Sequence, residues 1–390
     1  MKVLFVNSVC DYGSTGKIVR DLANGLKKEG HEVLICYGRH QAKEDTDTFY
    51  IGDKLTTYSH VFMTRVFNRH GLHSNRATQK LIEKIETFNP DVIHLHNLHG
   101  YYLNVEMLFE ALKTFKGKIY WTFHDCWPIS GSSAYFDYHG CKTWDEGCVE
   151  CNSTRDYPEA LVFKRQKKNF LWKKKAFSGL DNLTLVTPSY WLKELLAKSF
   201  LAQYPCEVIH NGINTNLFKP TYDAELTKKY ENKLVLLGVA SIWEQRKGLN
   251  DFIKLSTMIS DNYKIVLIGL TEEQKKSLPT AIDGVLRTDS AEQLAAYYTL
   301  SHRFINPTYE DNYPTTNIEA LCCHTPVIAY DTGGNKEVSI KPFMTIVPQG
   351  DLEAIVHELN SNKNISFDHF DSLSHDSHTF VSNTLKLYQR

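Results

Sequence analysis

The sequence predicts an α/β protein made of two consecutive domains, each with a parallel sheet covered by helices. Three observations support this fold class. The chain has 390 residues, which corresponds to roughly two to three domains of about 150 residues. Short apolar runs alternate with segments of helical periodicity, as they do in strand–helix–strand units. The alternation forms two series, and the join between them is expected around residues 211–220.

The start of the chain shows this unit most clearly. Residues 3–6 form an apolar run that predicts a buried first strand and is too short for a signal peptide. A turn-rich loop over residues 11–16 follows. From Lys17, apolar residues recur at helical spacing, and Gly30 ends the predicted helix. The next strand is predicted over residues 33–36.

Further apolar runs predict other strands in both domains. They cover residues 91–96, 119–123 and 183–187 in the first domain and residues 234–238, 264–269 and 325–329 in the second. Ligands of open α/β sheets bind at the carboxyl ends of the strands. Two such domains that face each other are expected to hold a cleft between them.

Composition and charge exclude several classes of protein. The 44 Lys and Arg balance 45 Asp and Glu to a net charge of −1, which argues against a general nucleic-acid binder and against a disordered acidic chain. No window approaches about 18 consecutive apolar residues, so no transmembrane helix is expected. The nine cysteines are an odd number and indicate a reducing cytoplasm rather than a disulfide framework.

Two motifs of the first domain follow predicted strands. Gly13 and Gly16 would let the backbone of their loop approach a ligand, and the following helix start offers N–H groups to an anion. A plain tight turn explains these glycines equally well, because the dinucleotide and Walker patterns are both absent. His124 lies just beyond a strand and beside Asp125. A lone histidine is usually structural, but this position favours a functional role.

Two motifs of the second domain also follow strands. Arg246 and Lys247 are adjacent in a strand–helix loop and suit a diphosphate, although a solvated basic turn is the simpler alternative. Asp311 and Glu319 are eight positions apart, and Pro314 between them predicts a helix start. A helix N-terminus attracts anions, and carboxylates accept hydrogen bonds from sugar hydroxyls. Alternatively, these carboxylates only complement the helix dipole.

A cysteine-rich stretch offers a weak candidate metal site. Cys141, Cys148 and Cys151 include a C-x2-C pair, and Cys126 or His139 could complete a zinc site. Thiols packed in a loop without metal are the favoured interpretation, so no metal is expected.

Two charged segments have a less specific meaning. A basic run is interrupted by aromatic and aliphatic residues, and such a helix can lie on an anionic membrane or be an ordinary solvated face. Its basic residues are Lys164, Arg165, Lys167, Lys168, Lys173, Lys174 and Lys175. Asp45 and Asp47 form a D-x-D pattern, which holds a metal in other transferases. It lies in a hydrophilic loop away from the predicted strand ends, so we expect it on the surface.

Together these four motifs resemble the family-four retaining glycosyltransferases. Their order is the glycine loop, the strand followed by His124, the basic pair, and the spaced acids followed by the residues 319–327. The segment 209–218, which contains Asn211, also resembles the interdomain Asn-Gly segment of that family. The resemblance covers nearly the whole chain, is most specific over residues 310–334, and is strongest to bacterial enzymes of exopolysaccharide, capsule and O-antigen assembly.

The sequence departs from the family pattern at two places. The family usually has Glu-x7-Glu, whereas Asp311 takes the first position here and Glu310 precedes it, so either acid could face the sugar. The family often has an arginine five residues before the lysine. Ile242 stands at that position here, so Arg246 is expected to supply the missing cation.

The resemblance implies a GT-B fold of two facing Rossmann-like domains. The acceptor-side domain would cover residues 1–213, the donor-side domain residues 214–370, and a final helix over residues 371–390 would return to the first domain. The implied activity is retaining, metal-independent transfer of a hexose-type sugar from a UDP- or GDP-linked donor to a glycan acceptor linked to polyprenyl diphosphate. No cofactor and no nucleic-acid partner are expected. The enzyme would be cytoplasmic, in peripheral contact with the inner membrane.

The resemblance also assigns site residues. The expected catalytic group is His124, Asp311, Glu310, Arg246 and Lys247. The expected donor-binding group is Gly13, Gly16, Asn211, Arg246, Lys247, Asn312, Tyr313, Thr315, Thr316 and Glu319. Within it, Arg246 and Lys247 would hold the diphosphate, together with backbone N–H groups near Thr315 and Thr316. Glu319 would hold the ribose, Asp311 or Glu310 the transferred sugar, and His124 would lie near the reacting carbon.

Two other functions fit the same motifs. A nucleotide-sugar epimerase of this fold is less favoured, because the acid pair and His124 suit transfer. A non-catalytic nucleotide-sugar-binding protein is less favoured, because all four motifs are present. A nicotinamide dehydrogenase is disfavoured by the missing dinucleotide glycine pattern.

Overall fold

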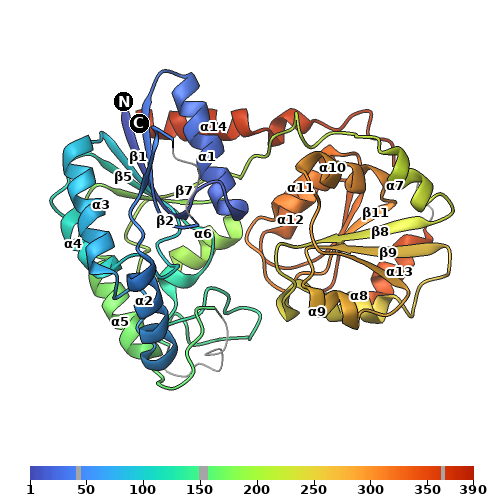
Figure 1. Cartoon of the computed structure of the whole chain (residues 1–390), viewed down its shortest axis with the longest axis horizontal. Coiled ribbons are helices and arrows are strands. Elements are labelled where there is room, and N and C mark those ends of the chain that lie inside the picture. The colour runs from blue at the N-terminus through green and yellow to red at the C-terminus, as the bar shows by residue number, and fades with distance from the viewer. Residues whose placement is uncertain (41–44, 149–156, 362–364) are drawn as a thin grey trace. The chain divides into compact units, whose positions relative to one another are not determined.

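The computed structural model describes residues 1–40, 45–148, 157–361 and 365–390. The chain divides into two compact units (Figure 1). Unit 1 comprises Met1–His210 and Phe380–Arg390, and unit 2 comprises Asn211–Thr379. Relative to the domains expected from the sequence, residues 211–213 and 371–379 belong to the second unit. Within the described chain, no helix has both the length and the apolar character that crossing a bilayer requires.

Unit 1 contains a seven-stranded parallel sheet in the order β3-β2-β1-β4-β5-β6-β7. Its strands are β1 (Lys2–Val9), β2 (Glu32–Arg39), β3 (Thr48–Tyr50), β4 (Val92–Leu95), β5 (Lys118–Thr122), β6 (Leu183–Thr187) and β7 (Cys206–Val208). Its helices are α1 (Gly13–Lys28), α2 (Lys54–Phe67), α3 (Asn75–Phe88), α4 (Val105–Leu112), α5 (Gln166–Ala176) and α6 (Tyr190–Ala197), together with most of α14 (Ser377–Gln389).

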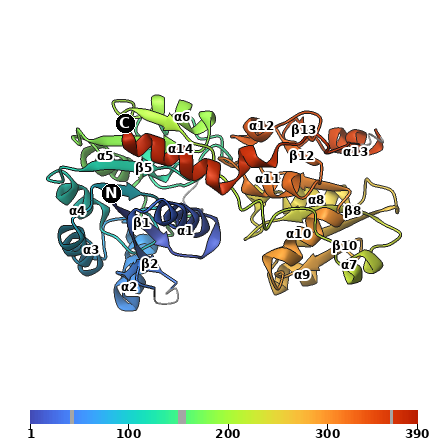
Figure 2. The same ribbon diagram turned by 90° about the horizontal axis from the view of Figure 1, so that it is seen from above.

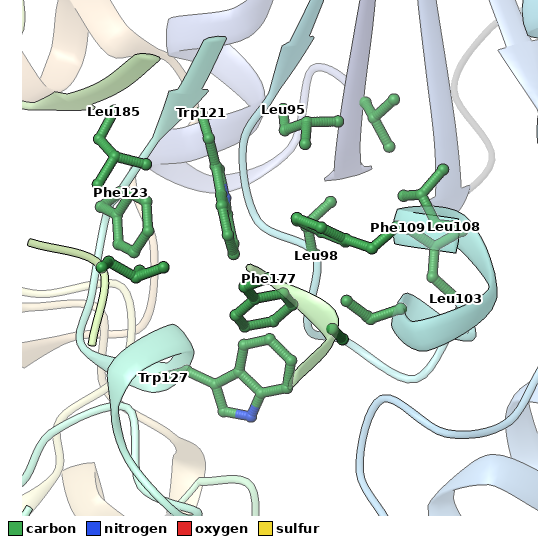
Figure 3. Packing of buried hydrophobic residues seen from close by; sticks show 14 of the residues in the cluster. Leu95, Leu98, Leu103, Leu108, Phe109, Trp121, Phe123, Trp127, Phe177 and Leu185 are labelled. Atoms are coloured by element: carbon green, nitrogen blue, oxygen red, sulfur yellow. The ribbon is translucent and has the colours of Figure 1, made fainter. Parts of the chain in front are cut away.

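Alternate residues of β1 enter separate cores on the two faces of this sheet. Leu4 belongs to a core that continues through Trp121, Phe109 and Phe177, whose rings pack together in Figure 3. Phe5 belongs to the core on the other face, which α1 and α14 cover. A buried parallel strand is apolar on both sides, which explains why these strands could be recognised as continuous apolar runs.

Helix α14 packs on the sheet of unit 1. The Tyr388 hydroxyl hydrogen-bonds His94 Nδ1, and the Tyr120 hydroxyl donates to the Leu387 carbonyl at 3.0 Å. Helix α14 also lies beside α1 in both views (Figures 1 and 2). The two helices approach closely at Gly25, where an added Cβ would stand 2.5 Å from a Val381 methyl carbon. The last residues of the chain therefore complete the core that contains Phe5.

Unit 2 contains a six-stranded parallel sheet in the order β10-β9-β8-β11-β12-β13. Its strands are β8 (Leu234–Val239), β9 (Tyr263–Ile268), β10 (Ile282–Val285), β11 (Arg303–Asn306), β12 (Val327–Tyr330) and β13 (Met344–Val347). Its helices are α7 (Ala224–Lys229), α8 (Leu249–Leu255), α9 (Glu272–Ser277), α10 (Ala291–Leu300), α11 (Thr315–Cys322), α12 (Asn335–Val338) and α13 (Leu352–Asn360).

Each sheet has one point where the strand order reverses. In unit 1 this point lies between β1 and β4, and in unit 2 it lies between β8 and β11. Ligands of open α/β sheets bind at such switch points, beyond the carboxyl ends of the strands. The two parallel sheets confirm the predicted fold class, and they single out the loops after β1, β4, β8 and β11.

Candidate functional site

The loops after β8 and β11 carry the charged motifs of unit 2. Arg246 and Lys247 lie in the 3-10 turn η2 (Gln245–Lys247), and Glu310 and Asp311 lie in the loop after β11. The Tyr309 amide donates to the Arg246 carbonyl at 2.8 Å, which joins the two loops. The two motifs are about 64 residues apart in the chain, yet the switch point brings them together.

Lys247 and Asp311 form an ion pair at the centre of this site. Lys247 Nζ lies 2.5 Å from Asp311 Oδ2, and both side chains are about three-quarters buried. Burial alone would raise the pKa of Asp311, but the charges of Lys247 and Arg246 and the hydrogen bond from Lys247 outweigh it and lower that pKa. Asp311 is therefore ionised, and the pair keeps part of its surface accessible to a ligand.

Arg246 and Glu310 are more deeply buried than this pair. Arg246 Nη1 donates to the Glu310 carbonyl at 2.6 Å, and Nη2 lies 3.6 Å from Glu244. Glu310 is 1% exposed, whereas its neighbour Asp311 retains an exposed edge. Of the two acids left open by the sequence, Asp311 is the one that a ligand can reach.

Helix α11 begins directly after this loop, with Pro314 as its N-cap. Thr315 and Thr316 occupy its first turn and are partly exposed, while Asn312 and Tyr313 before it are buried. Glu319 lies in the second turn, where its Oε2 accepts a hydrogen bond from the Tyr298 hydroxyl at 3.0 Å. No acid occupies the first turn of α11, so Glu319 does not serve mainly to complement the helix dipole.

In unit 1, His124 follows β5 and is paired with a second histidine. His96, just after β4, places its Nδ1 3.0 Å from His124 Nε2, and the two rings stack with centroids 5.3 Å apart. Burial chiefly, with help from the nearby His99, lowers the pKa of His124 to about 4, although Asp125 opposes this shift. Burial also lowers the pKa of His96, so both rings are neutral near pH 7.

The hydrogen bonds around His96 indicate the tautomers of this pair. His96 Nε2 is buried and has no hydrogen-bond partner among the described residues. An orphaned buried N–H is rarer than an orphaned lone pair, so the proton of His96 is assigned to Nδ1. His96 then donates to His124 Nε2, and His124 carries its own proton on Nδ1. His96 was not predicted as a site residue, although it ends a predicted strand.

Asp125 has a structural role beside His124. Its Oδ2 lies 2.6 Å from His99 Nε2, and its Oδ1 accepts from the Trp127 amide at 2.9 Å. Asp125 therefore fixes the turn after β5, and His96 rather than Asp125 fixes the His124 ring.

The two glycines of the first motif serve different purposes. Helix α1 begins at Gly13 rather than near Lys17, because the chain turns within a few residues after β1, with Gly13 at φ +65°. Nothing lies within 4 Å of an added Cβ at Gly13, which leaves open space there. A Cβ at Gly16 would lie 3.2 Å from a Val9 methyl carbon, so Gly16 lets α1 approach β1 closely. Asn211 is buried at the start of unit 2.

The D-x-D pattern and the cysteine-rich stretch are the next features singled out in the sequence. Asp47 is buried rather than on the surface, because Arg20 Nη1 and Lys27 Nζ both bind its carboxylate at about 3 Å. Cys148 is buried, with its sulfur 3.0 Å from the Gly131 amide, and Cys151 lies outside the described residues. Among the described residues, no three histidine, cysteine or acidic side chains are grouped closely enough to hold a metal ion.

Lys173 belongs to the basic run, but it is buried and is not part of an exposed face. It is 1% exposed, its Nζ donates to the carbonyls of Trp127 and Ser130 at 2.6 and 3.0 Å, and it lies 3.8 Å from the Trp127 ring centroid. Burial lowers its pKa to about 7. Lys173 therefore fastens the loop after β5 to helix α5.

The sequence is similar to those of known glycosyltransferases. Residues 15–217, more than half of the chain, match the family model of Glycosyltransferase Family 4, and residues 233–361 match that of glycosyl transferases group 1. A colanic acid biosynthesis glycosyltransferase, WcaC of Escherichia coli K12, is 25% identical over 87% of this chain and 85% of its own. An α-1,3-N-acetylgalactosaminyltransferase of Campylobacter jejuni, named for a diphospho-undecaprenol acceptor, is 24% identical over 47% of this chain and 54% of its own.

Solved structures share the fold. Sucrose-phosphate synthase of Thermosynechococcus elongatus matches with a TM-score of 0.70 at 15% identity, over 100% of this chain and 98% of that one. Anabaena HepE in complex with UDP matches with a TM-score of 0.66 at 13% identity, over 100% of both chains. The two parallel sheets are thus the Rossmann-like sheets of the GT-B fold.

Proposed function

Because the chain belongs to Glycosyltransferase Family 4, we propose that it transfers a hexose-type sugar from a UDP- or GDP-linked donor to a glycan acceptor in surface-polysaccharide synthesis. The whole-length similarity to a colanic acid glycosyltransferase supports the pathway class. The observation that carries the proposal is the Lys247–Asp311 pair at the switch point of unit 2, directly before the N-terminus of α11.

The charges of this site suit the two ends of a nucleotide sugar. Lys247 is a partly exposed cation that can move from Asp311 to a phosphate oxygen, and the first-turn N–H groups at Thr315 and Thr316 add positive potential. Asp311, once released, can accept hydrogen bonds from the hydroxyls of the transferred sugar. Glu319, one helical turn further on, is assigned to the ribose hydroxyls.

We infer a retaining reaction that needs no metal. The bond from the anomeric carbon to the diphosphate oxygen breaks, and negative charge grows on the leaving diphosphate. Fixed cations and a helix N-terminus can stabilise that charge in place of Mg²⁺. The acceptor hydroxyl gives its proton to the leaving phosphate as the new bond forms on the same face. His124, which is neutral, orients the transferred sugar and does not act as a strong base.

The acceptor is assigned to the glycans carried on polyprenyl diphosphate. The acceptor in the name of the Campylobacter jejuni relative belongs to this class and supports the assignment. Such an acceptor lies at a bilayer, so the proposal includes peripheral contact with the cytoplasmic face of the inner membrane.

Donor turnover in EDTA, with and without a lipid-linked glycan acceptor, tests the proposal. We expect nucleoside diphosphate to be released from one UDP- or GDP-sugar only when acceptor is present. Conversion of the donor sugar without acceptor would instead indicate an epimerase. Tight nucleotide binding without turnover of any donor would indicate a binding protein, and activity that EDTA abolishes and Mg²⁺ restores would overturn the metal-free step.

A further inference from the structure

Helix α2 exposes the face that a helix of a globular protein normally buries. Leu55, Tyr58 and Phe62 are 80%, 72% and 59% exposed, and their spacing of three and four residues places them on one face. The buried residues of the helix are instead the polar His60 and Thr64. The core of unit 1 therefore does not account for the apolar stripe of α2, which points to contact with an apolar phase outside this unit.

A second apolar segment adjoins the end of this helix. Residues 161–163 read Leu-Val-Phe, and each side chain is more than half exposed. The Leu161 and Phe163 amides donate to the carbonyls of Arg65 and Val66 at 2.7 and 3.1 Å. The Phe163 ring stacks on that of Phe67, with centroids 5.5 Å apart. Half of the exposed large hydrophobic side chains in the described chain lie within residues 54–67 and 161–171.

Helix α5 follows this segment and exposes positive charge. Lys167, Lys168, Lys174 and Lys175 are exposed, and the exposed Leu171 lies among them. The sequence contains no Asp or Glu within residues 54–70 or 160–180. Asn169 of α5 donates to the Asn68 carbonyl at 2.9 Å, so α5 is fastened to the end of α2. Both helices lie at the end of unit 1 away from the chain termini (Figure 1).

We propose that this apolar–basic surface, formed by the exposed faces of α2 and α5 and by residues 161–163, docks on an anionic lipid bilayer. Aromatic and aliphatic side chains would enter the boundary between headgroups and acyl chains, and the lysines would meet lipid phosphates. Protein interfaces are depleted of lysine, which argues against a protein partner. The exposed leucine and valine side chains would not strengthen binding to a nucleic-acid backbone, which argues against a nucleic-acid partner.

This inference deepens the proposed function, because it names the surface that would bring the enzyme to a lipid-linked acceptor. It can be tested without donor or acceptor, so its failure is distinguishable from failure of the glycosyl-transfer proposal. Co-sedimentation of the full chain with phosphatidylcholine vesicles, with and without phosphatidylglycerol, measures it directly. We expect binding to the phosphatidylglycerol vesicles that weakens as salt is raised, since salt screens exposed charges.

The charge contribution is measured by the triple variant Lys167→Gln, Lys168→Gln, Lys174→Gln. Each basic residue near an anionic membrane surface strengthens binding by roughly five-fold, so we expect about a hundred-fold loss. The matched control is Lys28→Gln, Lys116→Gln, Lys198→Gln, which removes the same charge from exposed positions elsewhere in unit 1. Lys173 is left unchanged, because it is buried and structural.

The apolar contribution is measured by Leu55→Ser, Tyr58→Ser, Phe62→Ser, with Tyr222→Ser, Leu373→Ser as the control on exposed positions of unit 2. We expect the first set to abolish sedimentation with vesicles and to leave the thermal unfolding midpoint unchanged, because the replaced side chains are solvent-exposed. The control set should bind as the wild type does.

Three results would overturn the proposal. The first is equal binding of the α2 and α5 variants and their controls, and the second is absence of binding to either kind of vesicle. The third is a concentration-dependent dimer in analytical ultracentrifugation that the α2 variant converts to a monomer, which would make this surface an interface between copies of the chain.

Discussion

The two candidate regions differ in how they use charge. Around Lys247 in unit 2, an ion pair stays partly open to solvent beside a helix N-terminus. Around His124 in unit 1, two neutral imidazoles, the half-buried His124 and the buried His96, are linked by one hydrogen bond. A region that must bind a diphosphate needs fixed cations, whereas a region that orients a sugar needs directional hydrogen bonds without net charge. This contrast supports the proposal that Lys247 binds the donor's phosphates in unit 2, and that His124 of unit 1 adds to Asp311 in orienting the sugar.

Replacement of Lys247 should cause the largest loss of turnover. In Lys247→Ala, we expect turnover to fall by about 10²–10³-fold, because a fixed group that stabilises developing charge is lost. Nucleotide affinity should fall less than turnover, because the charge on the diphosphate grows in the transition state. Steady-state kinetics together with calorimetry measure both quantities, and the exposed Lys276→Ala serves as the control. An equal loss of turnover and of nucleotide affinity would show that Lys247 only binds the nucleotide and does not stabilise the transition state.

Replacement of His124 tests the neutral region. We expect His124→Ala to lower turnover by about 10²-fold, because the sugar loses an orienting contact. Nucleoside diphosphate affinity should stay nearly intact. A parallel fall in affinity would move His124 into the nucleotide site or the core.

His96 should act through His124 with a smaller effect. In His96→Leu the donor to His124 Nε2 is lost, and we expect a loss of about ten-fold in turnover at unchanged nucleotide affinity. His96→Gln retains an N–H donor and should recover part of that loss. If Leu and Gln variants lose equal activity, His96 serves packing alone.

The smallest expected effect concerns Lys173, which is buried, whereas Lys247 is partly exposed to solvent. The pKa of Lys173 is lowered to about 7 in the folded protein, below the usual value of 10.5. Burial of the charged amine therefore lowers the free energy of unfolding by its full amount below about pH 7. This destabilising contribution disappears as the pH rises toward 10.5. We expect the free energy of unfolding of the wild type to increase over this range relative to Lys173→Met. The exposed Lys174→Met should show no such trend in urea titrations at several pH values.

The sequence reveals most of the buried strands, but not the central strand β11 and not the edge strands. The predicted strands are continuous apolar runs, whereas β11 is fully buried with only Phe304 and Ile305 between Arg303 and Asn306. The edge strands β3 and β7 have three residues each and are only partly buried. Those edge strands offer no periodicity from which to infer a strand. Arg246 and Lys247 were found because they follow a predicted strand, whereas Asp311 and Glu319 were found from their spacing around Pro314.

Interactions between distant residues were not predictable in the same way. His96 meets His124 across 28 positions, Lys173 meets Trp127 across 46, and Asp47 meets Arg20 across 27. Each of these side chains looks like an ordinary polar residue in its local sequence. Only the folded structure shows which distant residue each of them contacts.

Titration of the nucleoside diphosphate into the Glu319→Ala and His124→Ala variants, side by side in a calorimeter, tests the separation of the two regions most directly. Loss of a charged hydrogen bond to the ribose costs about 1.5–3 kcal/mol, so we expect Glu319→Ala to weaken affinity by roughly ten- to a hundred-fold. His124→Ala should bind as the wild type does. Unchanged affinity in Glu319→Ala, or an equal loss in both variants, would contradict the account.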